Sequence, residues 1–347
     1  MQLTLSFLAL ASLLSFTNAS PVPDPAAMSQ YGCSLWGTTT LVVTRTITKS
    51  STATSTPGAV LAVSSSHSSV PTTTSHTSTV VSSTAHPTST VKVVTPTTSS
   101  STPAATKVTS VAPLKNKKGL SFNNVAATTP FVNSASWAYN WDKVPGGTLS
   151  KNFLYVPMLW GADSGHTANW ISTATTAIAN GAEYLLGFNE PDLSSQSNLT
   201  PAQAAAAWKT YMQPFAGKVK LISPAITNGF STTAPLMGTP WMDAFLAACT
   251  GCTIDGIAMH IYDSATNVAY YKNYITSIGT KYGKPVWVTE FGASGTTAQQ
   301  QTFLETMLPF LDNLSSVQAY AYFGDLSGIL VNSDNSISPL GQTYASA

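Results

Sequence analysis

The sequence predicts an α/β protein built mainly on a (β/α)8 TIM barrel, and three observations support this fold class. Eight short apolar runs of strand length follow one another between residues 120 and 323, and helix-length segments separate the later runs. Continuous apolar strands that alternate with helices indicate a parallel sheet with both faces covered. Eight such units in residues 119–347 match the size of a closed barrel. An open doubly wound sheet is the competing interpretation, but no glycine-rich phosphate loop follows the first strand.

The expected strands are the eight apolar runs, near residues 120–123, 136–140, 153–159, 184–189, 219–224, 256–260, 286–290 and 318–323. Expected helices cover residues 167–180, 201–217, 240–248, 267–282 and 297–313. The second of these begins with Thr200 as its cap and Pro201 in its first turn, and Gly217 ends it. The first βα units show little helical pattern, so the barrel prediction depends on the strand count.

Composition divides the chain into four segments. Residues 1–19 hold an apolar stretch followed by small residues, as in a cleaved signal peptide, although no Lys or Arg precedes the stretch. Residues 20–63 have no assigned role. Residues 64–117 form a Ser/Thr/Pro-rich linker, with 28 Ser or Thr among residues 64–110, which we expect to be disordered and O-glycosylated. A plain flexible spacer is the alternative. The barrel occupies residues 118–347, and the whole pattern predicts a secreted, extracellular or cell-wall protein.

Charge and cysteine content narrow the classes of partner. Residues 119–347 carry eight Lys, no Arg and 13 acidic side chains, so we expect no nucleic-acid partner. No second apolar run reaches the length of a membrane span, and we expect a monomer. Cys249 and Cys252 are close enough in sequence to form a structural disulfide, and a redox Cys-x-x-Cys motif is the alternative. Cys33 is then left without an expected partner. Asn198 and Asn313 each begin an N-glycosylation sequence.

Two glutamates stand at the ends of expected strands. Glu190 follows the fourth strand, and Glu290 ends the seventh. Active sites of barrels are built at the C-terminal ends of the strands. Cleavage of a glycosidic bond requires two facing carboxyl groups, one to protonate the leaving oxygen and one to attack or to activate water. The alternatives are a structural ion pair or a helix cap, but no Lys or Arg is adjacent in sequence to either glutamate.

Polar neighbours of the two glutamates fit the same site. Asn189 is expected to donate a hydrogen bond to the sugar hydroxyl next to the scissile carbon. His260 and Tyr262, at the end of the sixth strand, are expected to orient the nucleophile. For His260, a satisfied core histidine is an equal alternative. Asp192 is expected to cap a loop rather than to be a third catalytic acid.

Aromatic residues at two strand ends are expected to line the mouth of the cleft. Trp141 and Trp160 follow the second and third strands, where their faces can pack on sugar rings, whereas Trp208 and Trp287 are assigned to the core. The barrel contains only two histidines, and no spacing typical of metal ligands occurs, so no metal and no cofactor are expected.

Several sequence blocks resemble fungal glycoside hydrolase family 128, which includes the alkali-sensitive linkage proteins of cell walls. The blocks occur in order over residues 118–347 and are Lys118-Gly-Leu-Ser-Phe-Asn123, Leu159-Trp-Gly161, Gly187-Phe-Asn-Glu-Pro-Asp192, Cys249-Thr-Gly-Cys-Thr-Ile-Asp255, Met259-His-Ile-Tyr262, Val288-Thr-Glu-Phe-Gly292, Leu330-Val-Asn-Ser-Asp334 and Leu340-Gly-Gln-Thr-Tyr344.

The resemblance implies a retaining endo-β-1,3-glucanase with a β-1,3-glucan or related wall polysaccharide as its partner. It implies that Glu190 is the acid/base and Glu290 the nucleophile, and that Asn189, His260 and Tyr262 occupy sugar-contacting positions. Phe323 ends the eighth strand where related enzymes often place a tryptophan, so the aromatic floor of the site differs from theirs. Two alternatives stay open: a glucan-binding wall protein without turnover, and a barrel hydrolase for another β-glycan.

Overall fold

The computed structural model describes residues 114–347. The predicted signal peptide, the segment 20–63 and residues 64–113 of the predicted linker lie outside the described residues. The last four residues of that linker contact the barrel: Leu114 packs against the cluster inside it, and the Lys117 ammonium donates to the carbonyls of Leu311 and Leu314. Within residues 114–347, no helix combines the length and the hydropathy needed to cross a membrane.

Eight parallel strands form the wall of the barrel, namely β1 (Lys118–Phe122), β2 (Trp137–Tyr139), β3 (Leu154–Tyr155), β4 (Tyr184–Leu186), β5 (Lys220–Ile222), β6 (Ile257–Ser264), β7 (Val286–Ser294) and β8 (Val317–Asp325). Six strands pair in the order β3-β2-β1-β8-β7-β6, and β4 pairs with β5. Isolated parallel bridges join these two sheets on both sides, between Met158 and Leu186 and between Ile222 and Gly256. The predicted parallel α/β fold is confirmed, and the closed ring of pairings is that of a (β/α)8 barrel.

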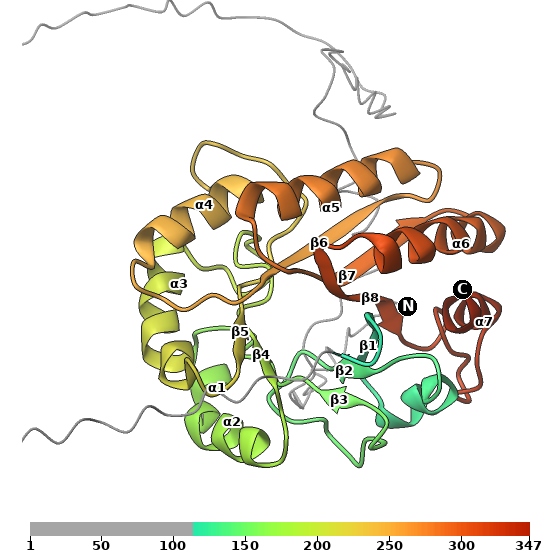
Figure 1. Cartoon of the computed structure of the whole chain (residues 1–347), viewed down its shortest axis with the longest axis horizontal. Helices are drawn as coiled ribbons and strands as arrows, with labels where there is room; N and C mark the ends of the chain where they lie inside the picture. The colour runs from blue at the N-terminus through green and yellow to red at the C-terminus, as the bar shows by residue number, and fades with distance from the viewer. Residues whose placement is uncertain (1–113) are drawn as a thin grey trace, which may run out of the picture. The chain divides into compact units, whose positions relative to one another are not determined.

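Helices surround this ring, as Figure 1 shows, and they are α1 (Ser164–Thr167), α2 (Trp170–Ala179), α3 (Pro201–Ala207), α4 (Thr239–Ala248), α5 (Val268–Tyr282), α6 (Thr297–Asn313) and α7 (Pro339–Ser346). The five helices expected from the sequence are present within a few residues of their expected bounds. The expected helix 201–217 is α3 followed by a π-helical turn, Trp208–Met212, and a 3₁₀ turn, Gln213–Phe215. The sequence did not predict α7, α1 or the 3₁₀ helix Val125–Phe131 after β1.

Local sequence explains where the helices begin. Thr200 and Thr296 each cap a helix, and Gln203 and Gln299 three residues later complete a capping box at α3 and α6. Ser338 caps α7 by accepting a hydrogen bond from the Gly341 amide, and Pro339 lies in the first turn. The connection between β2 and β3, residues 140–153, contains no helix.

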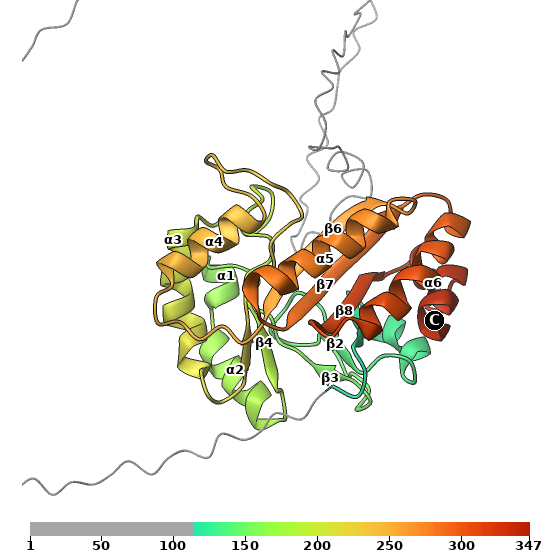
Figure 2. The same ribbon diagram turned by 45° about the horizontal axis from the view of Figure 1, so that its top comes forward.

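Side chains alternate between the two faces of each strand, which gives two layers of core. On β8, Ala319, Ala321 and Phe323 belong to the cluster inside the barrel, whereas Tyr320 and Tyr322 belong to the cluster between strands and helices. In Figure 2, β6 and β7 lie side by side beneath α5, which covers their outer face. The inner face of the strands is therefore free to present side chains at the barrel mouth.

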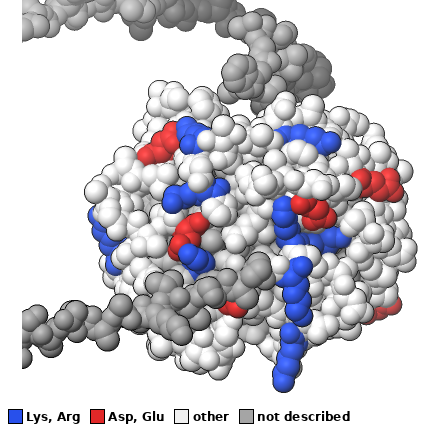
Figure 3. All heavy atoms as spheres, in the orientation of Figure 1, with Lys and Arg blue, Asp and Glu red and all other residues white. Residues whose placement is uncertain are grey.

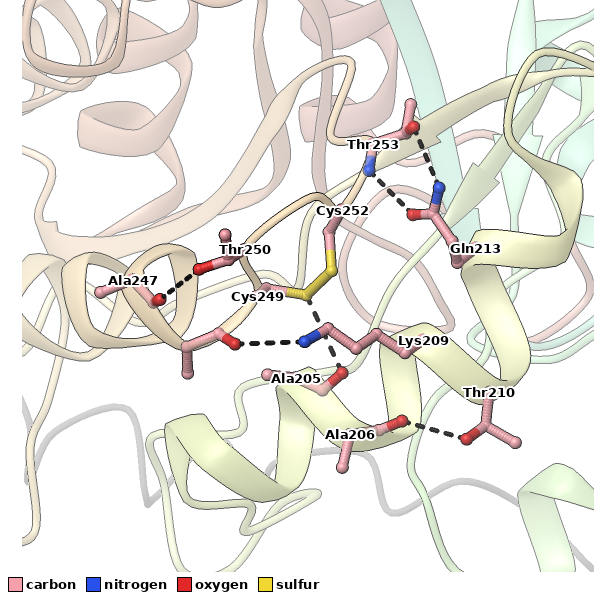
Figure 4. The surroundings of a disulfide bond; sticks show 11 residues. Ala205, Ala206, Lys209, Thr210, Gln213, Ala247, Cys249, Thr250, Cys252 and Thr253 are labelled. Carbon is pink, nitrogen blue, oxygen red and sulfur yellow. Dashed lines mark hydrogen bonds between the residues drawn. A yellow bond between two sulfur atoms is a disulfide. The ribbon is translucent and has the colours of Figure 1, made fainter. Parts of the chain in front are cut away.

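The structure pairs Cys249 with Cys252 in a disulfide at the end of α4 (Figure 4). The bridge closes a four-residue turn before β6. Gln213 exchanges two hydrogen bonds with Thr253 beside it, and these bonds fasten the turn to the helix segment that follows α3. The cysteines therefore belong to a structural loop on the outside of the barrel.

Charged side chains are sparse on the face shown in Figure 3, most of which consists of uncharged residues. The two predicted glycosylation sites, Asn198 and Asn313, are both exposed. Asn198 lies in the β4–α3 connection, and Asn313 is the last residue of α6.

Candidate active site

Strand β6 directs two polar side chains into the barrel mouth by simple alternation. Ala258 belongs to the cluster inside the barrel, and His260 and Tyr262 follow at intervals of two, so they share its face. Ile257, Met259 and Ile261 point outward to the helices. His260 is 1% exposed although it is polar. Both residues lie inside the strand, which continues to Ser264, rather than at its end as predicted.

A β-bulge places Glu290 on the same inner face. In the pairing of β6 with β7, Met259 lies opposite Val288 and His260 lies opposite Glu290, so Thr289 is an extra residue in β7. Such a bulge lets consecutive side chains turn toward one side of the sheet. Thr289 and Glu290 both contact His260, whereas Phe291 packs outward. Glu290 also lies inside its strand, because β7 continues to Ser294.

Glu190 lies in the connection after β4, four residues beyond the end of that strand. Its backbone has φ +39°, a left-handed conformation that is uncommon outside glycine. The Glu190 amide donates to the carbonyl of Ala225, which fixes this turn to the segment after β5. Trp141, at the end of β2, also has a left-handed backbone, with φ +57°. Strained backbone of this kind clusters at functional sites.

The two carboxyl groups face each other across His260. The His260 Nδ1 atom lies 2.8 Å from Glu190 Oε1 and 3.4 Å from Glu290 Oε2, and Nε2 lies 3.0 Å from the Thr289 hydroxyl. One oxygen from each glutamate and a nitrogen of His260 all lie within 4.8 Å of one another. Glu190 and Glu290 are 6% and 2% exposed. The spacing leaves room for one reacting centre between the carboxyl groups.

Glu290 accepts hydrogen bonds on both oxygens. The indole N–H of Trp141 donates to Oε1 at 2.7 Å, and the Tyr262 hydroxyl donates to Oε2 at 2.5 Å. The Tyr139 hydroxyl lies 3.5 Å from Oε1 and donates to the Thr289 carbonyl at 3.0 Å. An ionised carboxylate accepts hydrogen bonds and donates none, so this set of donors suits a nucleophile held in one orientation.

Burial and the neighbouring charges shift the pKa values of the site. Burial raises the pKa of Glu190, the hydrogen bond and the charge of His260 oppose this rise, and the charge of Glu290 adds to it. Burial acts to lower the pKa of His260, but Glu290 and Glu190 together hold it above its ordinary value. Burial, followed by the nearby glutamates, keeps the pKa of Tyr262 and Tyr139 well above the usual range. The tyrosines are therefore hydrogen-bond donors at neutral pH.

The predicted aromatic residues all belong to the cluster inside the barrel, but two of them have other contacts than expected. Trp141 is 6% exposed, and it contributes its N–H to Glu290 rather than an open ring face. Trp160 is 8% exposed because the ring of His166 stacks on it at 4.7 Å. Phe323 packs edge-on against Trp141 and Tyr262, at 5.8 and 5.9 Å. It thereby braces both donors to Glu290.

Asn189 and Asp192 flank Glu190 in the sequence. The Asn189 side chain donates to Gln196 at 3.2 Å, and its buried carbonyl oxygen has no partner among residues 114–347. Asp192 accepts hydrogen bonds from the backbone and hydroxyl of Thr227 and from the Gly238 amide, which pins the β5–α4 connection. Asp192 therefore holds a loop, as its sequence position indicated.

Sequence reasoning missed Tyr139 and Thr289. Tyr139 could have been found, because Trp137, Tyr139 and Trp141 recur at intervals of two and so share the inner face of β2. Thr289 carried no such signal, because its role depends on the bulge.

The trio Glu190, His260 and Glu290 has side chains of the kinds that bind metals. Its polar atoms, however, are engaged with one another and with Thr289, Trp141 and Tyr262 at hydrogen-bonding distances. The arrangement can transfer a proton from one carboxyl group while the other attacks, which is the chemistry of paired carboxylates.

Two carboxyl groups that face each other at the C-terminal mouth of a (β/α)8 barrel define the class of glycoside hydrolases. Residues 119–344 match the glycosyl hydrolase catalytic core family. The chain is similar to a family 128 (subgroup III) curdlan-specific exo-β-1,3-glucanase from Blastomyces gilchristii, whose structure was solved with glucose. The two sequences are 40% identical, and the structures superpose with a TM-score of 0.60. The match covers 67% of this chain and 98% of the glucanase. The chain belongs to glycoside hydrolase family 128.

Two further relatives support this assignment. A family 128 (subgroup II) endo-β-1,3-glucanase from Sorangium cellulosum is 31% identical, with a TM-score of 0.58, over 67% of this chain and 98% of that one. Alkali-sensitive linkage protein 1 from Schizosaccharomyces pombe is 31% identical over 257 residues, which are 67% of this chain. The chain spans 45% of the length of that curated relative.

Proposed function

We propose that the protein cleaves β-1,3-glucan with retention of configuration, with Glu190 as acid/base and Glu290 as nucleophile. The observation that carries this proposal is the pair of buried glutamates with oxygens within 4.8 Å of each other. Retaining enzymes hold their carboxyl groups about 5–5.5 Å apart, whereas inverting enzymes leave about 6.5–9.5 Å for a water molecule. The identity to family 128 β-1,3-glucanases supports the choice of linkage.

The two steps follow from the contacts of each glutamate. Glu190 gives its proton to the glycosidic oxygen while Glu290 attacks the anomeric carbon, so the bond to the leaving sugar breaks and a glycosyl-enzyme forms. Glu190, now ionised, takes a proton from water, and this water displaces Glu290 from the anomeric carbon. The raised pKa of Glu190 suits the proton donor. The donors Trp141 and Tyr262 suit the nucleophile, because they fix both of its oxygens.

A substitution of the nucleophile tests this function. Glu290→Gln keeps the size of the side chain and removes its charge, so we expect hydrolysis of soluble β-1,3-glucan to fall by at least about a thousandfold. The release of reducing ends measures this loss, and circular dichroism checks the fold. Asp243→Asn is the matched control, because Asp243 forms an exposed ion pair with Lys281 on the outer helices. Turnover near the wild-type rate in Glu290→Gln would overturn the assignment.

The same preparation of purified protein can be used to determine the linkage that is cleaved, the mode of cleavage and the extent of turnover. Product profiles on β-1,3-glucan, mixed-linkage glucan and mannan separate the substrate classes. Release of monosaccharide alone indicates exo action, and a ladder of oligosaccharides indicates endo action. Retention on glucan without new reducing ends would favour the alternative of a glucan-binding protein.

We also propose that the protein is secreted and associates with a polysaccharide wall. The support is the apolar segment 1–19, the Ser/Thr/Pro-rich residues 64–117, and the two exposed glycosylation sequences at Asn198 and Asn313. A disulfide in a small surface loop fits an oxidising compartment. Fractionation of the source cells, with and without glycosidase treatment, tests this location. A protein recovered unglycosylated from the cytosol would contradict it.

A further inference from the structure

A second histidine stands at the rim of the barrel mouth, outside the catalytic trio. His166 lies in α1, the short helix that follows β3 in the chain. Its ring stacks on Trp160 with 4.7 Å between the ring centroids and an angle of 29° between the planes. Trp160 in turn belongs to the aromatic cluster inside the barrel, with Trp141 and Phe323. His166 therefore covers, on its outer side, a tryptophan that belongs to the same cluster as the Trp141 donor to Glu290.

Two contacts hold the imidazole of His166, and a third holds the backbone around it. Its Nδ1 atom lies 2.5 Å from Asp163 Oδ2, and Trp160 supports one face of the ring. Lys143 donates to the carbonyls of Ala168 and His166, at 2.9 and 3.4 Å, and so fastens α1 to the connection that follows Trp141. Side chains held this firmly lose little conformational freedom when a ligand binds.

The fold does not require this arrangement of the imidazole. Asp163 caps α1 through its other oxygen, Oδ1, which accepts from the Gly165 and His166 amides. An ion pair this exposed contributes little to stability, since the Asp163 side chain is 60% exposed and the His166 side chain 35%. The contacts instead orient the ring nitrogen Nε2, which lies on the side opposite Asp163 and makes no hydrogen bond within residues 114–347.

We propose that His166 is a specificity-determining residue, whose Nε2 pairs with a hydroxyl of a glucosyl unit neighbouring the one that lies between Glu190 and Glu290. This inference rests on the proposed glucanase function. A ring nitrogen can accept from a hydroxyl, or donate to it when protonated, and a supported ring at a cleft rim fits a sugar that carries hydroxyls around its edge. Asp163 acts as the positioning residue, because it holds Nδ1 and turns Nε2 toward the ligand.

Gly161 lies directly against this pair, so a substitution there can displace it. A Cβ atom at residue 161 would lie 3.1 Å from Asp163 Oδ2 and 3.3 Å from His166 Nδ1. Gly161→Ala would therefore press on the pair without removing any of its polar atoms. The variant tests position, whereas His166→Phe tests the nitrogen and keeps a ring on Trp160.

The experiment measures binding of a β-1,3-linked glucose hexasaccharide to the Glu290→Gln protein by titration calorimetry. We expect His166→Phe in this background to raise Kd about five- to tenfold, as for the loss of one hydrogen bond, with an unchanged melting temperature. Gly161→Ala and Asp163→Asn should weaken binding in the same direction. Asp243→Asn, which removes an equally exposed charge far from the mouth, should leave Kd unchanged.

Turnover in the otherwise wild-type protein provides the second readout. His166→Phe should raise KM for the hexasaccharide and leave kcat nearly constant. It should not change the hydrolysis of an aryl β-glucoside, because that substrate has a single glucosyl unit. An unchanged Kd, or equal losses on both substrates, would overturn the role of His166. Failure of the proposed function can be told apart from failure of this inference. If the proposed function is wrong, the wild-type protein releases no reducing ends, and the binding comparison still decides the role of His166.

Discussion

Trp141 connects the wall of the barrel to the carboxylate of Glu290. It follows β2, has a left-handed backbone, and donates its indole N–H to Glu290 at 2.7 Å. Phe323 and Tyr139 pack against its ring, so the donor is held in place from two sides. A residue that the sequence suggested as a platform for sugars therefore holds the carboxylate that we propose as the nucleophile.

Loss of this donor should slow the reaction without preventing folding. Trp141→Phe keeps an aromatic ring between Phe323 and Tyr139 but removes the N–H, and a hydrogen bond to a charged group contributes about 1.5–3 kcal/mol. We expect kcat/KM to fall by about ten- to a hundredfold in steady-state assays on β-1,3-glucan. Tyr139→Phe is the comparison, because its hydroxyl lies farther away, at 3.5 Å, and should matter less. Equal losses in the two variants would contradict this account.

The pH profile should report the contact between His260 and Glu190. Burial raises the pKa of Glu190, and His260 partly reverses this rise through its hydrogen bond and charge. His260→Gln removes the charge, so the pKa of Glu190 should rise further. Because the proton donor fails once it is ionised, activity disappears as pH rises through this pKa. The alkaline limb of kcat/KM should therefore move to higher pH in His260→Gln, and a shift to lower pH would refute the assignment of Glu190.

At the scale of elements, the eight strands and five larger helices could be predicted because each has a strong local signal. Continuous apolar runs mark the strands, and caps such as Thr200 and Thr296 mark helix starts. Helix α7 was missed although Ser338 and Pro339 mark its start, because its short sequence has only three buried residues.

The site was predictable in its residues but not in their orientation. Glu190, Glu290, His260 and Tyr262 could be picked out because they follow apolar runs. The expected strand ends were wrong for β6 and β7, which continue beyond these side chains. The extra residue Thr289 is invisible in the sequence, because a bulge is a property of two paired strands and not of one.

The disulfide at the end of α4 should stabilise the fold without affecting the site. Closing a four-residue loop removes chain entropy equivalent to about 2 kcal/mol in the unfolded state. The double variant Cys249→Ser/Cys252→Ser should lose about this much free energy of unfolding, measured by urea denaturation, and keep its kcat/KM. A matching loss of activity would show that the turn also supports the barrel mouth.

At the scale of the whole molecule, one buried carboxyl group should contribute to how stability depends on pH. Asp325 ends β8, is 0% exposed, and neither of its oxygens has a hydrogen-bond partner among residues 114–347. Burial raises its pKa from 3.8 to about 7. Because the folded pKa lies above the unfolded one, the folded protein loses stability as pH rises from about 4 to 7.

Replacing this group should remove its own contribution to the pH dependence of stability. Asp325→Asn keeps the shape and cannot ionise, so it should raise the free energy of unfolding above pH 7 by up to about 4 kcal/mol and change little near pH 4. Denaturation at several pH values measures the difference. Glu305→Gln serves as the control, since Glu305 is exposed on α6 and should change little at any pH. Destabilisation by Asp325→Asn at pH 8 would show that the carboxylate has a stabilising partner.

The left-handed backbone at Glu190 and Trp141 has a consequence for engineering this barrel. A side chain in such a conformation costs of order 1–3 kcal/mol, which packing elsewhere in the fold must offset. Glu190 is the proposed acid, and Trp141 donates to the proposed nucleophile, so the molecule gives up stability at two positions of the proposed catalytic site. A search for more thermostable variants would select substitutions at these positions. Substitutions that remove the left-handed backbone would raise the stability of the scaffold, and the protein would no longer turn over its substrate.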